Sequence, residues 1–118
     1  MLWSSTRKWR SPGNFDTREI GDIVAAIVGL LHLKVHVAQA MSLKDKRRIL
    51  KGFKDRTRNR YNVSIAEVDG LQSHRSSVLA IVAVSNDHQY TEGILSKITK
   101  LAENHHDMIL IEQTTDWL

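Results

Sequence analysis

The sequence predicts a two-layer α+β domain with two helices on one face of a four-stranded antiparallel sheet. Segments with strand or helix periodicity follow the order strand, helix, strand, strand, helix, strand. A helix that connects two strands of one sheet does so with a right-handed crossover, so both helices are expected on the same face. The strand predicted over residues 77–85 is apolar on both faces, which is typical of a central strand. Together these observations indicate the ferredoxin-like βαββαβ sandwich.

The chain divides near residue 28 into an extension and a domain. Residues 1–27 contain the only Pro, several Ser and Thr, and two Trp interleaved with Arg and Lys. This composition predicts a flexible N-terminal extension, with a short helical lead-in over residues 17–26. Residues 28–118 form the predicted ferredoxin-like domain, and 118 residues leave room for one such domain.

The first strand of the domain is predicted over residues 28–37, where the side chains alternate between two faces. The predicted core face consists of Leu31, Leu33, Val35 and Val37. The opposite face consists of Leu30, His32, Lys34 and His36. The first strand therefore has one buried face and one open face.

One helix is predicted from Ser42 to Tyr61. Ser42 can cap the first free amides, and Asp45 at the third helical position favours a helix start. With successive residues about 100° apart around the axis, one arc is apolar and is predicted to be buried. This arc consists of Ile49, Leu50, Phe53 and Thr57, with Leu43 at its edge. Lys46 falls on the apolar side near the helix start, where its side chain is expected to snorkel to solvent.

Two strands and a turn are predicted after this helix. A short strand rich in β-branched residues covers residues 62–69, a turn covers residues 70–76, and a second strand covers residues 77–85. In the predicted topology the outer face of this last strand is exposed. Because soluble monomers seldom expose such an apolar patch, we predict a homo-oligomer, a dimer formed through the open face or an edge strand.

A second helix and a final strand complete the domain. The helix is predicted to start at the cap Asn86, with Gln89 in a capping-box arrangement, and to end near Asn104. Its predicted inner face consists of Tyr90, Ile94, Leu95, Ile98 and Leu101. The final strand is predicted over residues 108–115, and Trp117 is predicted to be a packing residue.

The first helix also carries a row of cations, which we call the cationic stripe. It lies within an arc of about 120° and extends about 21 Å along the axis. The stripe consists of Lys44, Arg47, Arg48, Lys51, Lys54 and Arg58. Residues 44–60 carry a net charge of +7 from nine basic and two acidic residues, whereas the whole chain carries +4. The stripe predicts contact with a polyanion. The alternative is a solvated charged face, since Asp55 can neutralise Lys51 or Arg58.

Composition excludes several classes of protein. The chain has no Cys, which excludes disulfides, a thiolate nucleophile and Cys-based zinc sites. No apolar run reaches the length of about 18 residues that a membrane span requires, and no secretory signal is recognisable. We therefore expect a cytoplasmic protein without a membrane partner.

Several segments of the domain resemble those of a known family. SLKDKRRILKGFKDRTRNRYNVSIAEVD is followed at the expected distance by VLAIVAVSND. This combination is similar to the YlxP-like family of small bacterial proteins, over about residues 28–118. The resemblance implies a ferredoxin-like fold and an intracellular bacterial protein without an established function. Family members are often encoded beside translation and transcription-elongation factors, which points to RNA or the ribosome. The extension lies outside the family pattern, and His74 stands where the family tends to have Trp.

Catalytic and metal sites are weakly signalled. Ferredoxin-like acylphosphatases cradle phosphate with a glycine-rich loop after the first strand, but the corresponding loop here, AQAMS, has no Gly. Glu67 and Asp69 project to one face of a strand and could act as acid and base, but such pairs are more often solvated or bonded to basic neighbours. His32 and His36 lie about 13 Å apart on an extended strand, too far to share one ion. We expect no catalytic residue, no metal and no cofactor.

The function predicted from the sequence is that of a non-catalytic accessory module whose cationic stripe contacts structured RNA or a ribosomal surface. The two strands predicted to be central contain no aromatic residue, which excludes base stacking on the sheet and leaves phosphate contact along the helix. The alternative is a structural or regulatory homo-oligomer without a nucleic-acid partner. A weaker alternative is an enzyme that acts on a phosphorylated small molecule.

Overall fold

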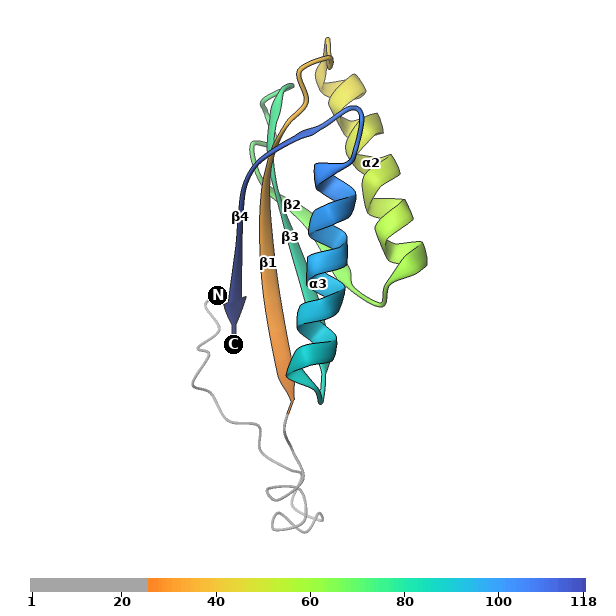
Figure 1. The fold of residues 1–118 in the computed structure, drawn as a ribbon. Helices are drawn as coiled ribbons and strands as arrows, with labels where there is room; N and C mark the ends of the chain where they lie inside the picture. The colour runs from red at the N-terminus through yellow and green to blue at the C-terminus, as the bar shows by residue number, and fades with distance from the viewer. Residues whose placement is uncertain (1–25) are drawn as a thin grey trace, which may run out of the picture.

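The structure is a computed structural model that describes residues 26–118, and it has the ferredoxin-like βαββαβ architecture predicted (Figure 1). Its elements are β1 (Ile27–His36), α2 (Leu43–Arg60), β2 (Ser64–Asp69), β3 (Ser76–Ser85), α3 (His88–Glu103) and β4 (Ile109–Trp117). The strand order is β2-β3-β1-β4, and every neighbouring pair is antiparallel. The extension and the helical lead-in predicted over residues 17–26 lie almost wholly outside the described residues.

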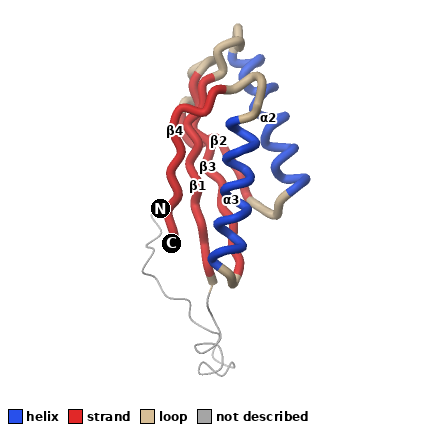
Figure 2. The backbone as a smooth tube through the Cα atoms, viewed as in Figure 1, coloured by secondary structure: helices blue, strands red, loops and turns tan. Residues whose placement is uncertain are grey.

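The two helices form a layer on one face of the sheet (Figure 2). β1 and β3 are the central strands, as predicted, and they pair without interruption from Ile27↔Ser85 to His36↔Ser76. The pairing of β1 with β4 shifts between Lys34 and Val35, and that of β2 with β3 shifts between Glu67 and Asp69. β2 and β4 are the two edges of the described sheet.

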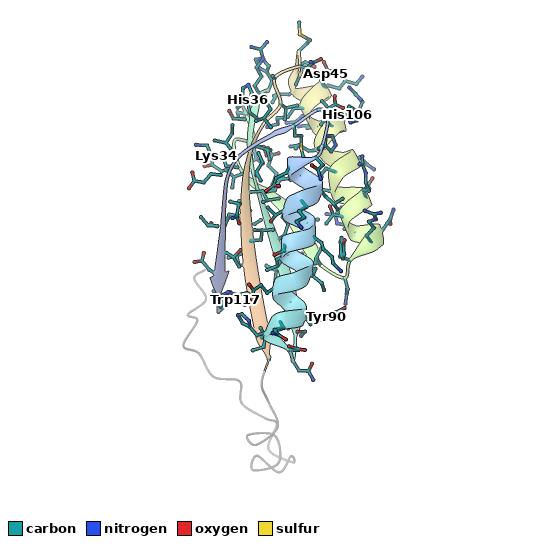
Figure 3. The ribbon with its side chains drawn as sticks, viewed as in Figure 1. Lys34, His36, Asp45, Tyr90, His106 and Trp117 are labelled. Carbon is teal, nitrogen blue, oxygen red and sulfur yellow. The ribbon has the colours of Figure 1, made fainter. Side chains whose placement is uncertain are left out.

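The core lies between the sheet and the helices, and the alternation predicted for β1 is confirmed. Leu31, Leu33 and Val35 are buried beneath the helices, whereas Lys34 is exposed on the opposite face. Figure 3 shows Lys34 on the side of the sheet away from the helices. β3 places Leu79, Ile81 and Ala83 in the same core. On its outer face Val84 is 63% exposed, so the described domain has an open sheet face, as predicted.

α2 forms where its cap and its apolar arc predict it. The Ser42 hydroxyl accepts a hydrogen bond from the Asp45 amide at 3.1 Å, and the Asp45 carboxylate accepts one from the Met41 amide at 3.1 Å. The first bond satisfies an amide of the first turn that has no partner within the helix, and the second ties the residue before the cap to that turn. The residues of the apolar arc are all buried, as predicted: Ile49, Leu50, Phe53 and Thr57.

α3 begins one residue later than predicted. Its cap is Asp87 instead of Asn86, and the Asp87 carboxylate accepts the Gln89 amide at 3.0 Å. The Ser85 hydroxyl meanwhile accepts the Asp87 amide at 3.0 Å, which fixes the turn from β3. The C-terminal cap is Asn104, in agreement with the predicted end of the helix.

The predicted inner face of α3 is wrong at one position. Tyr90 is 62% exposed, and Thr91 is buried in its place. The Thr91 hydroxyl lies 2.6 Å from that of Ser85, so a polar partner at the end of β3 allows Thr91 to be buried. Leu95 and Ile98 are fully buried, as predicted, whereas Ile94 and Leu101 are partly buried against the core.

Candidate nucleic-acid interface

The cationic stripe lies on the part of α2 that faces solvent. Five of its six residues are exposed and Lys54 is half-buried: Lys44, Arg47, Arg48, Lys51, Lys54 and Arg58. Two further exposed basic residues near the end of α2, Arg56 and Arg60, extend the basic surface beyond the predicted stripe. The helix is 18 residues long and its opposite side is fixed in the core, so these cations are carried on a rigid support.

Asp55 neutralises the middle of the stripe. Its carboxylate lies 2.7 Å from Lys51 Nζ and 3.7 Å from an Arg58 nitrogen. The hydrogen bond from Lys51, together with the positive charge of Lys51 and its neighbours, holds the pKa of Asp55 below its usual value although partial desolvation opposes this. Asp55 therefore stays ionised, and both of its partners are less available to an external anion.

Arg58 has a second intramolecular partner. Its Nη2 donates a hydrogen bond to the carbonyl oxygen of Ile65 in β2 at 2.8 Å. This bond ties the C-terminal half of α2 to the edge of the sheet. Among residues 26–118, the stripe residues without a carboxylate within 4.0 Å are Lys44, Arg47, Arg48 and Lys54. These four form the available part of the stripe.

Lys46 does not snorkel, contrary to the sequence-based expectation. Its side chain is 0% exposed, and its ammonium lies 2.8 Å from Glu67 Oε2, 2.6 Å from the Gly70 carbonyl and 3.2 Å from the Ser76 carbonyl. An ammonium group has three N–H donors, so these three acceptors satisfy it completely. Lys46 thus fastens the first turn of α2 to the β2–β3 hairpin and contributes nothing to the exposed basic surface.

Glu67 and Asp69 do not share a site. Glu67 Oε2 accepts hydrogen bonds from both Lys46 and the Ser77 hydroxyl, the latter at 2.7 Å. The irregular pairing of β2 with β3 separates the two acids, and the Asp69 carboxylate accepts the Gly70 amide at 2.8 Å. Glu67 is thus bonded to a basic neighbour. From the sequence, this arrangement is expected for such acid pairs more often than a catalytic one.

The histidines are dispersed among the described residues. His32 and His36 lie on the open face of β1, four residues apart on one extended strand. His105 and His106 follow α3, and their ligand atoms and the Asp107 carboxylate lie within 4.8 Å of one another. His105 Nδ1 accepts the Asp107 amide at 3.0 Å, so this local turn occupies one of the two ring nitrogens of His105.

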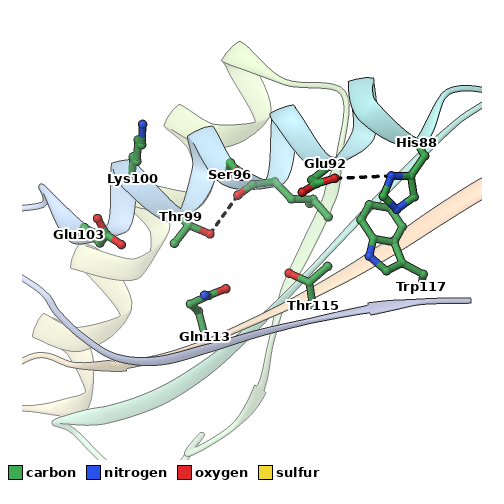
Figure 4. A pocket seen from close by; sticks show the side chains of 10 residues that line it. His88, Glu92, Ser96, Thr99, Lys100, Glu103, Gln113, Thr115 and Trp117 are labelled. Atoms are coloured by element: carbon green, nitrogen blue, oxygen red, sulfur yellow. Dashed lines mark hydrogen bonds and ion pairs between the residues drawn. The ribbon is translucent and has the colours of Figure 1, made fainter.

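A groove lies between α3 and β4, away from the cationic stripe (Figure 4). Its volume is about 410 Å³, and Leu95 and Trp117 line it together with polar side chains of α3 and β4. The rings of His88 and Trp117 pack against each other at one end, with their centroids 4.0 Å apart and their planes tilted by 39°. Trp117 is a packing residue, as predicted, although it remains 39% exposed. A smaller hollow of about 170 Å³ lies on the open face beside His32, Lys34 and Glu112.

The sequence and fold of the domain are similar to those of known proteins. Residues 28–115 match a family described as "Protein of unknown function (DUF503)". The chain belongs to the DUF503 family. The match begins one residue after the start of β1 and includes both helices, so all six elements of this DUF503 domain contribute to it. This family match and the YlxP relative described below confirm the resemblance to YlxP-like proteins that the sequence indicates.

A curated relative of this DUF503 protein is "Uncharacterized protein YlxP" of Bacillus subtilis (strain 168). It is 28% identical over 91 residues, which cover 77% of this chain and 99% of the relative.

Two designed proteins are similar in structure. "De novo designed protein Foldit4" has a TM-score of 0.47 at 14% identity and covers 77% of this chain and 96% of its own. "De novo designed protein Ferredog-Diesel" has a TM-score of 0.43 at 12% identity, and the match covers 98% of this chain and 95% of the designed chain.

Neither helix of residues 26–118 combines the length and apolar character that are needed to cross a bilayer. α2 is the longer of the two, but its charge excludes it from such a role.

Proposed function

We propose that this DUF503 protein is a non-catalytic accessory module of the cytoplasm that binds structured RNA or a ribosomal surface through α2. The observation that carries the proposal is a group of four cations without carboxylate partners in residues 26–118. Three are exposed and the fourth, Lys54, is half-buried: Lys44, Arg47, Arg48 and Lys54. They project from one helix that is rigidly packed on its other side. Such a row can contact several phosphates at once.

The proposed binding mode is contact with phosphates and not the reading of bases. The open face of β1 and β3 offers aliphatic residues, His and Lys, but no Phe, Tyr or Trp on which a base could stack. Phosphate contacts tolerate different sequences and weaken steeply as salt is added, because each contact releases condensed counterions. Structured RNA suits this mode, since a rigid helix can contact phosphates across a groove.

The proposal is tested by titrating the full chain with an RNA hairpin at several salt concentrations. The variant Arg47→Glu/Arg48→Glu should bind more weakly, and its slope of log affinity against log salt should fall by roughly 0.7 to 0.9 for each phosphate that the variant no longer neutralises. The matched control is Lys34→Glu/Lys97→Glu, which makes the same change in net charge on other exposed surfaces. Equally weakened binding in both variants would show that net charge, and not the stripe, causes binding.

A further inference from the structure

β4 leaves one side of its backbone without a partner among the described residues. It is the edge of the sheet next to β1, and it is nine residues long. Natural edge strands are commonly protected by charged side chains, especially Lys, by Pro, by a bulge, by a short length or by a covering segment. The sequence of β4, ILIEQTTDW, contains two acids and an irregular pairing near its start, but neither Lys nor Pro, and all but one of its residues are exposed. β4 is thus a long edge that is open to pairing.

The backbone groups that face outward can be assigned from the ladder. The Leu118 amide donates to the Val28 carbonyl at 3.0 Å, so Leu118 directs its hydrogen-bonding groups toward β1. In an antiparallel ladder the direction alternates from residue to residue. Trp117, Thr115 and Gln113 therefore direct their N–H and C=O groups toward the free side. A second strand can be added there without disturbing the pairing with β1.

α3 carries opposite charges on either side of a small residue along the same groove. Glu92 and Lys100 both line it, and Ser96 lies midway between them (Figure 4). Within residues 26–118, Lys100 has no carboxylate within 4.0 Å, and the only basic group within 4.0 Å of the Glu92 carboxylate is His88, at 3.5 Å. A helix with this pattern is complementary to an antiparallel copy of itself, because Glu92 of each copy faces Lys100 of the other.

The centre of the helix pattern lies level with the centre of the strand. The rings of His88 and Trp117 are 4.0 Å apart, and the chain reverses direction between α3 and β4. Ser96 is about 12 Å from His88 along the helix, and Gln113 is about 13 Å from Trp117 along the strand. A single two-fold axis near Gln113 therefore pairs the two β4 edges and also places Glu92 of each copy opposite Lys100 of the other.

From this geometry we infer that two copies of the chain pair through their β4 edges to form a continuous eight-stranded sheet. The strands run antiparallel, with Gln113 opposite its own counterpart. The pairing covers residues 111–115 of each copy, because the irregular pairing with β1 turns the Ile109 backbone toward β1. Glu92 of each subunit forms an ion pair with Lys100 of the second copy across the groove. In this register Glu112 faces Thr114 of the second copy, so no acidic side chains are placed directly opposite each other. α2 packs at the other end of the sheet, near β2, and both stripes stay accessible (Figure 1).

The test is the oligomeric state of the full chain and its variants, measured by sedimentation equilibrium. The wild-type chain should be a dimer. Glu92→Lys and Lys100→Glu should each weaken dimerisation by about tenfold or more, because each replaces two attractive contacts with two repulsive ones. The double variant Glu92→Lys/Lys100→Glu should restore the dimer. Thr115→Pro should give a monomer, because it removes an outward N–H from the edge, where Pro is tolerated.

Two controls separate this interface from other surfaces. Lys97→Glu changes the charge of α3 at an exposed position that does not line the groove, and it should leave the dimer intact. Val84→Lys places a charge on the open sheet face and should also leave it intact. A monomeric wild type at every concentration, or a dimer that is disrupted by Val84→Lys but not by the β4 and groove variants, would overturn the proposal. Circular dichroism on each variant confirms folding.

Discussion

Lys46 Nζ lies 2.8 Å from Glu67 Oε2, and the lysine side chain is completely buried while that of Glu67 is 13% exposed. The pair joins the first turn of α2 to β2, and the same ammonium binds the carbonyls of Gly70 and Ser76 at the two ends of the hairpin loop. A buried ion pair whose hydrogen bonds are all satisfied specifies one arrangement of the elements that it joins. The helix that carries the stripe is thereby held in a fixed position.

Lys46→Met is predicted to destabilise the domain by about 3 kcal/mol, because it leaves Glu67 and two carbonyls without their partner. Urea unfolding of the purified chain measures the change. Lys44→Met, two residues away and exposed, is the control and should change stability by less than about 0.5 kcal/mol. A similar result for both variants would mean that the buried pair does not matter for stability.

Thr57→Val is predicted to stabilise the domain by about 1 kcal/mol. Thr57 is 0% exposed, and its Oγ1 has no hydrogen-bond partner among the described residues. Replacing a buried hydroxyl that lacks a partner by a methyl group removes a desolvation cost and keeps the shape. The midpoint of thermal unfolding should rise. A fall in the midpoint would indicate that Oγ1 binds a partner within the folded chain.

Acidification below pH 6.5 is predicted to destabilise the domain through His105. Burial beside Phe53 lowers the pKa of His105 from its usual value of 6.5; Arg56 and His106 lower it further, and Asp107 partly opposes them. The unfolded chain therefore takes up the proton more readily than the folded chain. The corresponding stability is fully present above pH 6.5 and is lost as the pH falls toward the lower folded pKa.

The pH effect is measured by urea unfolding at several pH values between 8 and 5 for wild type and His105→Gln. The wild-type chain should lose more stability across this interval than the variant, because glutamine does not titrate. His74→Gln is the control, since His74 is exposed in the turn between β2 and β3 and is not among the groups that shift the pKa of His105. Parallel curves for wild type and His105→Gln would contradict the assignment.

Asp55→Ala is predicted to increase affinity for RNA. It removes the carboxylate that contacts Lys51 and Arg58, so the middle of the stripe gains free cations and one net positive charge. Filter binding at two salt concentrations should show tighter binding and a steeper salt dependence than for wild type. Asp116→Ala makes the same change in net charge on β4. An equal gain in that control would remove the special role of Asp55.

Much of the fold is determined by patterns that are local in sequence. The alternation in β1 and the apolar arc of α2 each identify a buried face, because burial follows the period of the backbone. The candidate stripe was predictable for the same reason, since its residues share one side of a helix. The intramolecular partners of the stripe residues were less predictable from the sequence. The bond from Arg58 to the Ile65 carbonyl depends on how closely α2 approaches β2.

The wrong predictions of burial for Tyr90 and of exposure for Lys46 share a physical cause. In each case a polar side chain is buried because it bonds to a partner that lies on another element of the fold. Thr91 is buried and Tyr90 exposed because the Ser85 hydroxyl lies beside Thr91. Lys46 is buried because Glu67, 21 residues later, lies opposite it. A Lys in the apolar arc of one helix and a Glu in the following strand are the available sequence signals, but only the packing of α2 on β2 brings them together.

The most direct test of the role of α2 is an NMR titration of the isotopically labelled full chain with an RNA hairpin at low salt. We predict that amide shifts change mainly in residues 43–60, with the largest changes near Arg47 and Arg48, and that added salt reverses them. Shift changes confined to β1 and β3 on the open sheet face, or no changes at all, would contradict the proposed role of α2.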